Sequence, residues 1–239
     1  FMIPKIIHQI WFSPDGKYPE KYDFCQESWS KINPDYQYIL WDEEKSQHLI
    51  ETEFPNFLNT YNQVKDVMVK TDLLRILIGY HYGGVYADLD VECLRPIDEW
   101  ILDLDKINIP LEPKDHNPFM LGCATFCLKE KNEKLLKLLE FGLEKFEIEK
   151  QWKIGYNMEA FGPKNWTQFQ KKHPEYYNII DTHLMFPIPD TSISSKLNEL
   201  YKDIIKNKNF GDAYCVHYWD HLHWPRPSIL DEYYNDLKP

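Results

Sequence analysis

A buried helix that turns directly into a short acidic strand constrains the fold of this chain more than any other feature. Residues 73–80 are apolar on nearly every side, which is typical of a helix buried in a protein interior. Gly83 and Gly84 follow, and glycine tolerates the left-handed backbone that ends a helix. The sequence therefore predicts a helix over residues 64–82 and a strand over residues 85–91.

The predicted strand carries Asp88 and Asp90. A strand has a period of two, so both carboxylates should share one face while Leu89 and Val91 point into the core. Two like charges held this close favour a bound cation, and oxygen ligands suit Mg²⁺ or Mn²⁺. An arbitrary Asp-x-Asp is more often a solvated strand end, but the buried helix beside this pair favours a metal site.

Asp72 and Arg75 share a face of the same helix because they are three residues apart. Charged groups at the edge of a buried helix must be paired or must face a polar cleft. One explanation is a structural Asp72–Arg75 salt bridge. Next to an acidic strand end we favour a second one, in which Arg75 contacts phosphate or sugar oxygens and Asp72 holds a sugar hydroxyl.

Together these motifs resemble the signature of family 32 glycosyltransferases. That family has Asp-x-x-Arg, then a helix, then Gly-Gly-x-Tyr-x-Asp-x-Asp, which residues 72–75 and 83–90 match. Its other marks are similar to residues 3–11, 33–36, 41–42 and 162–163, and the same arrangement is found in the large glucosylating toxins. The resemblance implies a GT-A fold, a divalent metal, a nucleoside-diphosphate sugar as donor and retention of anomeric configuration.

The resemblance also places the nucleotide base beside Trp11. This residue ends the predicted first strand, and ligands of open α/β sheets bind outside the carboxyl ends of the strands. A flat indole there can stack on a base. Tyr86 lies on the Asp88 face and is either a core tyrosine or a hydroxyl donor to a phosphate or ribose. We take both as candidate donor-binding residues.

A second cluster, residues 215–224, contains three histidines. In the family, a C-terminal segment with a histidine and a final Ser-Trp closes the donor site. His217 takes the place of that histidine as a metal ligand, and Trp224 takes the place of the tryptophan. His223 stands where serine is usual, so His221 and His223 remain alternatives to His217. Imidazole suits Mn²⁺ better than Mg²⁺.

Composition is typical of one globular α/β domain, with 239 residues of which 43% are hydrophobic. A formal charge of −11 argues against nucleic acid as a partner. No window approaches the roughly 18 consecutive apolar residues that a membrane span requires. Five scattered cysteines favour reduced thiols and hence a cytoplasmic location.

Strand and helix patterns alternate along the chain, which favours a mostly parallel central sheet flanked by helices, as in the GT-A fold. We treat residues 1–239 as a single catalytic domain. Residues 1–130 form its nucleotide-sugar-binding part, and residues 131–239 form an acceptor side and closing segment that is loop-rich beyond Gln151. The predicted strands are 5–12, 36–41, 107–111 and 119–128, and the other predicted helices are 20–32, 43–52 and 132–150.

The predicted function is that of a retaining hexosyltransferase that needs Mn²⁺ or Mg²⁺. It would move a hexose from a UDP-sugar, or alternatively from GDP-mannose, to a hydroxyl of a glycan or other acceptor. Two alternatives stay open. One is a sugar-nucleotide hydrolase or nucleotidyltransferase that uses the same metal. The other is a non-catalytic module in which the aspartates bind Ca²⁺ or carbohydrate.

Overall fold

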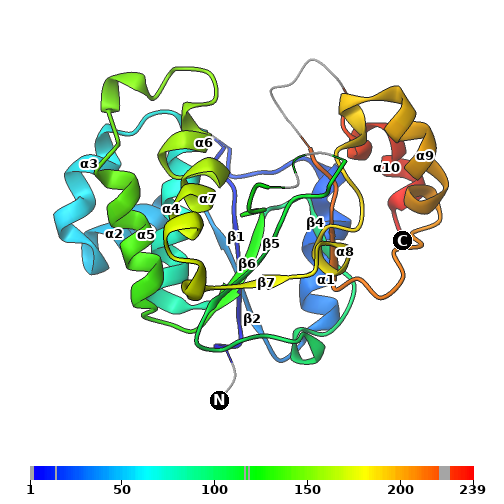
Figure 1. The fold of residues 1–239 in the computed structure, drawn as a ribbon, viewed down its shortest axis with the longest axis horizontal. Coiled ribbons are helices and arrows are strands. Elements are labelled where there is room, and N and C mark those ends of the chain that lie inside the picture. The colour runs from blue at the N-terminus through cyan, green and yellow to red at the C-terminus, as the bar shows by residue number, and fades with distance from the viewer. Residues whose placement is uncertain (1–2, 14, 116, 118, 221–226) are drawn as a thin grey trace.

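A six-stranded sheet, in the order β2-β1-β3-β6-β5-β7, forms the centre of the molecule (Figure 1). The computed structural model describes residues 3–13, 15–115, 117, 119–220 and 227–239. Of the strands in this sheet, only β6 runs antiparallel to its neighbours, so the predicted mostly parallel sheet is confirmed. The strands are β1 (Ile6–Ile10), β2 (Gln37–Trp41), β3 (Gly84–Ala87), β5 (Ile107–Pro110), β6 (Thr125–Leu128) and β7 (Tyr177–Ile180).

A second, two-stranded sheet joins the middle of the chain to its C-terminal part. β4 (Val91–Cys93) pairs antiparallel with β8 (Cys215–His217), and Val91 lies opposite His217. β4 follows β3 after a short turn, so this small sheet begins where the acidic motif ends.

Helices cover both faces of the central sheet. Figure 1 shows α2 to α7 on one side of the sheet and α1, α8, α9 and α10 on the other. The helices are α1 (Asp23–Ile32), α2 (Glu43–Glu53), α3 (Leu58–Gln63), α4 (Val67–Tyr82), α5 (Glu133–Leu143), α6 (Tyr156–Ala160), α7 (Pro163–Lys172), α8 (Thr182–Met185), α9 (Ser195–Lys206) and α10 (Ile229–Leu237).

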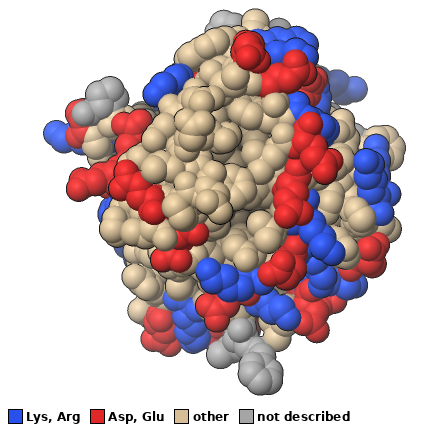
Figure 2. All heavy atoms as spheres, turned by 90° about the vertical axis from the view of Figure 1, so that its left-hand side faces the viewer, with Lys and Arg blue, Asp and Glu red and all other residues tan. Residues whose placement is uncertain are grey.

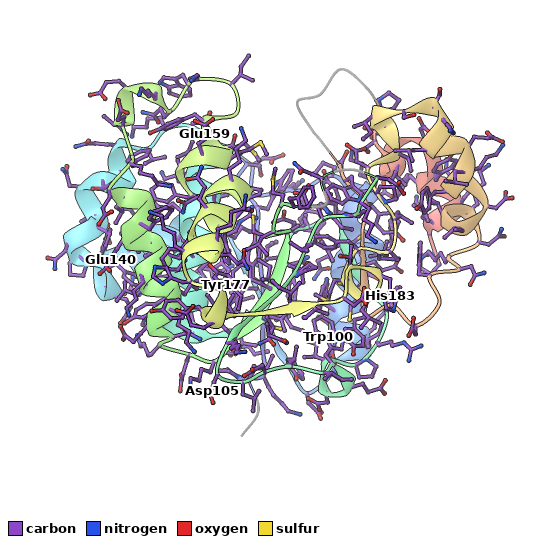
Figure 3. All side chains as sticks on the ribbon, in the orientation of Figure 1. Trp100, Asp105, Glu140, Glu159, Tyr177 and His183 are labelled. Atoms are coloured by element: carbon purple, nitrogen blue, oxygen red, sulfur yellow. The ribbon has the colours of Figure 1, made fainter. Side chains whose placement is uncertain are left out.

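Two hydrophobic clusters fill the space between these layers. Successive strand residues contribute to opposite clusters, as the strand period requires: Val85 and Cys127 lie in one, and Tyr86 and Phe126 lie in the other. In the first cluster Trp100, labelled in Figure 3, stacks on Tyr214 with ring centroids 5.4 Å apart. This contact holds the chain before β8 against the segment that follows β4.

The central helix α4 begins and ends at residues suited to those positions. Asp66 caps it by accepting a hydrogen bond from the backbone of Val69, so the helix starts three residues later than the sequence predicted. At its other end Gly83 (φ +63°) and Gly84 (φ +80°) adopt positive φ, and each lies against neighbouring backbone. The predicted glycine stop is confirmed.

The prediction that Asp88 and Asp90 both lie on a strand is wrong. β3 ends at Ala87, and a turn closed by a 3.1 Å hydrogen bond from the Val91 amide to the Asp88 carbonyl separates it from β4. Leu89 and Val91 are buried as expected. The turn forms because the chain leaves the central sheet here to pair with β8.

Other boundaries also differ from prediction. The helix expected over residues 132–150 ends at Leu143, because Gly142 packs closely on Phe161 and the backbone turns there. The strand expected over 119–128 begins only at Thr125. The chain beyond Gln151 is not loop-rich. Its described residues form β7, β8 and helices α6 to α10, of which α6 and α8 are too short to show a clear period.

Charges are mixed on the face seen in Figure 2, which is the left-hand side of Figure 1. A broad uncharged area is bordered there by acidic side chains, with Lys and Arg interspersed among them. Among the described residues, no helix is both long and apolar enough to cross a bilayer.

Candidate active site

Helix α4 supplies two buried charged residues to the site. Arg75 Nη2 lies 3.0 Å from Asp72 Oδ1, so the predicted pair on one helix face does form. Arg75 Nη1 donates a 2.9 Å hydrogen bond to the carbonyl oxygen of Cys123. Both charged side chains are almost completely buried.

Arg75 also reaches the acidic turn. Its Nη2 lies 3.3 Å from Asp88 Oδ1, and the Tyr86 hydroxyl donates a 2.6 Å hydrogen bond to the same oxygen. The guanidinium sits over the Tyr86 ring, 5.0 Å from its centroid. Arg75 therefore links Asp72 to Asp88, and Tyr86 orients the Asp88 carboxylate.

Burial changes the protonation of these groups. It raises the pKa of Asp72 to about 6, although the positive charge of Arg75 opposes the shift. Burial likewise raises the pKa of Asp88, against the opposing charge of Arg75. The carboxylates surround Arg75 and keep its own pKa well above the ordinary value despite burial.

The Gln9 side chain holds the backbone of the acidic turn. Gln9 Nε2 donates a 2.9 Å hydrogen bond to the Asp88 carbonyl. The Tyr38 hydroxyl in turn donates a 2.7 Å hydrogen bond to Gln9 Oε1. Gln9 on β1 and Tyr38 on β2 thus hold the turn in position.

Strand β8 brings His217 to the same turn, 127 positions along the chain from Asp90. Its Nε2 lies 3.1 Å from Asp90 Oδ2. The Asp220 amide donates a 2.7 Å hydrogen bond to the same carboxylate oxygen, and the Tyr218 amide donates to the Asp90 carbonyl. Asp220 was not among the predicted residues, because a backbone donor leaves no mark in a sequence.

The three predicted metal ligands come together. One ligand atom from each of Asp88, Asp90 and His217 lies within 4.8 Å of the others. Within the part of the chain that the structure describes, the buried Nδ1 of His217 has no hydrogen-bond partner. Two carboxylates and an imidazole form a donor set that fits Mn²⁺.

Opposing effects set the pKa of His217. Burial disfavours the imidazolium, but the charge and hydrogen bond of Asp90, with the charges of Asp88 and Glu112, outweigh burial and raise the pKa above 6.5. A cation at this position would have to displace that proton.

Trp11 lies one residue beyond the end of β1, half-buried. Its Nε1 donates a 2.9 Å hydrogen bond to the Lys17 carbonyl, and its ring centroid is 5.6 Å from that of Tyr22. The Tyr22 hydroxyl donates to Asp220, whose amide contacts Asp90 of the Asp88–Asp90–His217 cluster. Three predicted or alternative residues, Trp224, His221 and His223, lie outside the described residues.

Two further residues contact Asp72. Asn157 Nδ2, from α6, donates a 3.3 Å hydrogen bond to Asp72 Oδ2. A Cβ on Gly162 would lie 2.8 Å from the same oxygen, which explains why glycine precedes Pro163 at the start of α7. Asn157 was not predicted as a site residue, because a five-residue helix shows no sequence pattern that would single it out.

The family model for a glycosyltransferase sugar-binding region containing the DXD motif matches residues 19–105, which include Asp72, Arg75, Asp88 and Asp90. Residues 19–105 are thus similar to the DXD-containing region of glycosyltransferases. The predicted resemblance to this group of transferases is therefore confirmed.

Curated relatives match part of this chain. Inositol phosphoceramide mannosyltransferase 3 of Schizosaccharomyces pombe is 43% identical over 96 residues, which are 40% of this chain and 26% of the relative. An initiation-specific alpha-1,6-mannosyltransferase of Candida albicans is 34% identical over 124 residues, covering 50% of this chain and 31% of that protein. The chain thus spans only about a quarter to a third of the length of these relatives.

Solved structures extend the likeness to the whole fold. The PaToxG glycosyltransferase superposes on 87% of this chain and 78% of its own, with a TM-score of 0.58 and 18% identity. A glycosyltransferase involved in the glycosylation of the major capsid of PBCV-1 covers 97% of this chain and 100% of its own, with a TM-score of 0.54 and 14% identity. The predicted GT-A type of α/β fold is confirmed.

Proposed function

We propose that this chain is a metal-dependent glycosyltransferase that moves a hexose from a nucleoside-diphosphate sugar to an acceptor hydroxyl. The observation that carries the proposal is the convergence of Asp88, Asp90 and His217 beside the buried Asp72–Arg75 pair. The DXD family match supports the same reaction class.

Asp88, Asp90 and His217 would hold a divalent ion, with Mn²⁺ favoured by the imidazole. When bound, the ion supplies positive charge for the diphosphate leaving group. Arg75 is fixed by its neighbours before any donor arrives, so it can stabilise the same negative charge without reorganisation. Tyr86 holds the Asp88 carboxylate in place for this task.

Asp72 would orient the transferred sugar by accepting a hydrogen bond from one of its hydroxyls. Its carboxylate is anchored on one side by Arg75 and on the other by Asn157. We further propose attack by the acceptor hydroxyl on the face that the leaving group departs from, with retention of configuration. The resemblance to family 32 transferases supports this outcome.

Mannose is the hexose that we rank first. The relatives in Schizosaccharomyces pombe and Candida albicans are both named as mannosyltransferases. This moves GDP-mannose ahead of the UDP-hexose that the sequence alone favoured.

The metal role is tested by calorimetry of GDP-mannose, GDP and UDP-glucose with Mn²⁺ and then with a chelator. We expect binding to need the ion, because two carboxylates and a diphosphate otherwise repel one another. Asp88→Asn and Asp90→Asn should each weaken Mn²⁺-dependent binding at least about 10- to 100-fold. Asp105→Asn, an exposed carboxylate paired with Lys129, is the matched control.

The two aspartate variants should stay folded but lose some stability, because each asparagine gives up a charged contact, with Arg75 at position 88 and with His217 at position 90. Equal nucleotide binding with and without metal would contradict the proposal. Incubation of GDP-mannose with and without a mannoside acceptor distinguishes transfer from hydrolysis. A protein that binds Ca²⁺ or sugar but neither GDP nor UDP would be a binding module instead.

A further inference from the structure

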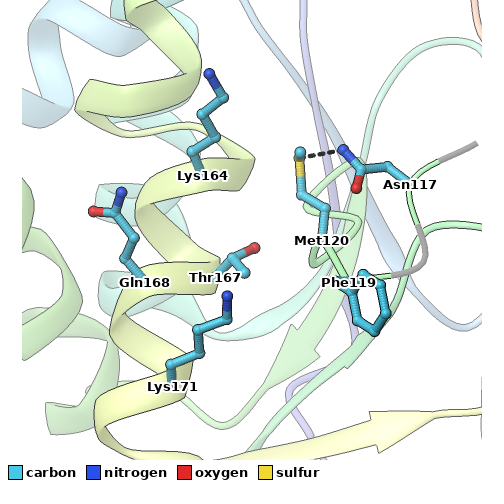
Figure 4. A pocket seen from close by; sticks show the side chains of 7 residues that line it. All are labelled: Asn117, Phe119, Met120, Lys164, Thr167, Gln168 and Lys171. Carbon is cyan, nitrogen blue, oxygen red and sulfur yellow. Dashed lines mark hydrogen bonds between the residues drawn. The ribbon is translucent and has the colours of Figure 1, made fainter.

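A cavity of about 240 Å³ lies between α7 and the segment that precedes β6 (Figure 4). One wall consists of side chains on α7, and the other comes from the connection between β5 and β6. The lining residues are Asn117, Phe119, Met120, Lys164, Thr167, Gln168 and Lys171.

Both walls of this cavity are connected through the backbone to groups next to Asp72 and Arg75. The Thr167 hydroxyl accepts a 2.9 Å hydrogen bond from the Leu121 amide, which ties the walls together. Two residues after Leu121, the Cys123 carbonyl contacts Arg75. At the other wall α7 begins at Pro163, and a Cβ on the preceding Gly162 would lie 2.8 Å from Asp72 Oδ2. Each wall is therefore only a few residues along the chain from a group next to the Asp72–Arg75 pair.

The charge of the lining is unusual for this protein. The chain carries a formal charge of −11, yet the only ionisable side chains among the described lining residues are two lysines. Lys171 forms no ion pair with any described carboxylate, and Figure 4 shows its side chain extending along the space between the walls. Lys164 lies 3.5 Å from Glu159, and both side chains are about half exposed. The cavity is thus suited to an anionic group.

The opposite wall offers a surface for a sugar ring. Phe119 is 78% exposed, so its ring is accessible to a bound molecule. The apolar face of a sugar can pack on such a ring, while the Asn117 and Gln168 amides can bond its hydroxyls.

We propose that this cavity is the acceptor subsite and binds a phosphorylated sugar or polyol. Lys171 and Lys164 hold the phosphate, and Phe119 supports the ring. The inference rests on the proposed transferase function, because it assigns the acceptor of that reaction.

The test measures binding of mannose 6-phosphate, mannose and inorganic phosphate to the whole chain in the presence of Mn²⁺ and GDP. We expect mannose 6-phosphate to bind more tightly than either of the others. Lys171→Gln and Phe119→Ala should each weaken it about three- to fivefold, the size of an exposed charge or aromatic contact. Lys172→Gln is the matched control, because Lys172 lies over the Phe141 ring instead of the cavity.

Vesicles of phosphatidylinositol and of phosphatidylcholine, added as competitors, distinguish a lipid headgroup from a free phosphorylated sugar as the source of the ligand. Competition by the first alone assigns the subsite to a lipid-borne polyol phosphate, and competition by neither assigns it to the free form. All variants should bind GDP as wild type does. The inference is overturned if wild type binds GDP but shows no preference for mannose 6-phosphate, or if Lys172→Gln weakens binding as much as Lys171→Gln. Loss of GDP binding by wild type would instead contradict the transferase proposal.

Discussion

Arg75 is the residue on which most polar contacts of the site converge. It contacts two carboxylates and a backbone carbonyl, while its buried Nε has no partner among the described residues. The desolvation penalty of a buried charge can exceed the stability that its ion pairs return. The arrangement is therefore better explained by binding of further negative charge than by stabilisation of the fold.

Trp11 makes a contact that affinity measurements can separate from folding. Its indole N–H is fixed by the Lys17 carbonyl, so the ring orientation is set before ligand arrives. If the indole stacks on the base, Trp11→Ala should weaken GDP binding by about 1–3 kcal/mol and leave the protein folded. Trp152→Ala, at a 66% exposed tryptophan, should leave GDP affinity unchanged. An unfolded Trp11 variant would show that the residue belongs to the core.

His8 is held neutral by its surroundings. Trp41 Nε1 donates to His8 Nδ1 at 3.1 Å, so the ring proton sits on Nε2 and is donated to the Gly83 carbonyl, also at 3.1 Å. Burial lowers the pKa of His8 from 6.5 to about 4, although the Gly83 hydrogen bond opposes the shift. This histidine therefore supports the end of α4 and takes no part in metal binding.

The lowered pKa of His8 predicts a loss of stability in mild acid. The unfolded chain takes up this proton near pH 6.5 and the folded protein only near pH 4, so stability falls as pH drops through that window. From pH 8 to pH 5 the loss should be about 2 kcal/mol. His8→Gln should lack this part of the pH dependence in urea unfolding. Parallel curves for the two proteins would contradict the assignment.

Gly83 and Gly84 join α4 to β3, the strand that ends at the acidic turn. A Cβ on Gly84 would lie 2.3 Å from the Ile6 carbonyl oxygen, on a strand that cannot move without disrupting the sheet. At Gly211, which also has positive φ, a Cβ would meet nothing within 4 Å.

We therefore expect Gly84→Ala to destabilise the protein by about 2–5 kcal/mol, the sum of backbone strain and overpacking. Gly211→Ala should cost only the strain, about 1–2 kcal/mol. Urea unfolding of both variants measures the difference. Similar losses for the two would show that the close approach at Gly84 relaxes at little cost.

At the scale of helices and strands, the sequence predicted the features that depend on local residue patterns. The apolar run of α4, its glycine stop and the strands β1 and β2 were found within a few residues. The acidic turn was mistaken for a strand because Leu89 and Val91 alternate with the aspartates, while the departure from the sheet depends on β8. Helices α6 and α8 were missed because four or five residues show no period, and the longer helices α7, α9 and α10 were missed as well.

At the scale of the whole molecule, the site unites parts of the chain that are far apart in sequence. Asp72, Arg75, Asp88 and Asp90 were predictable because they share one helix–turn–strand unit. The Cys123 carbonyl and the Asp220 amide were not, because any residue type supplies such groups. The pairing of Val91 with His217 depends on the fold, and only the family resemblance pointed to His217.

This pairing predicts how pH affects metal binding. Only neutral imidazole can bind a metal, and Asp90 raises the pKa of His217 above 6.5 against the effect of burial. As pH is lowered, Mn²⁺-dependent GDP affinity should therefore begin to fall while the pH is still above 6.5. Below the pKa of His217 the affinity should decline up to about tenfold per pH unit. His217→Ala should bind more weakly at pH 8 and show little of this dependence. Identical pH profiles would remove His217 from the ligand set.

The β4–β8 pairing also sets when the proposed site can form during synthesis. Asp88 and Asp90 leave the ribosome long before β8, so a growing chain presents two carboxylates without His217. Only when β8 docks beside β4 do all three residues come together. A chain that stops before residue 215 would keep the whole acidic motif and still lack His217, so we expect the proposed metal site to form only after β8 is made.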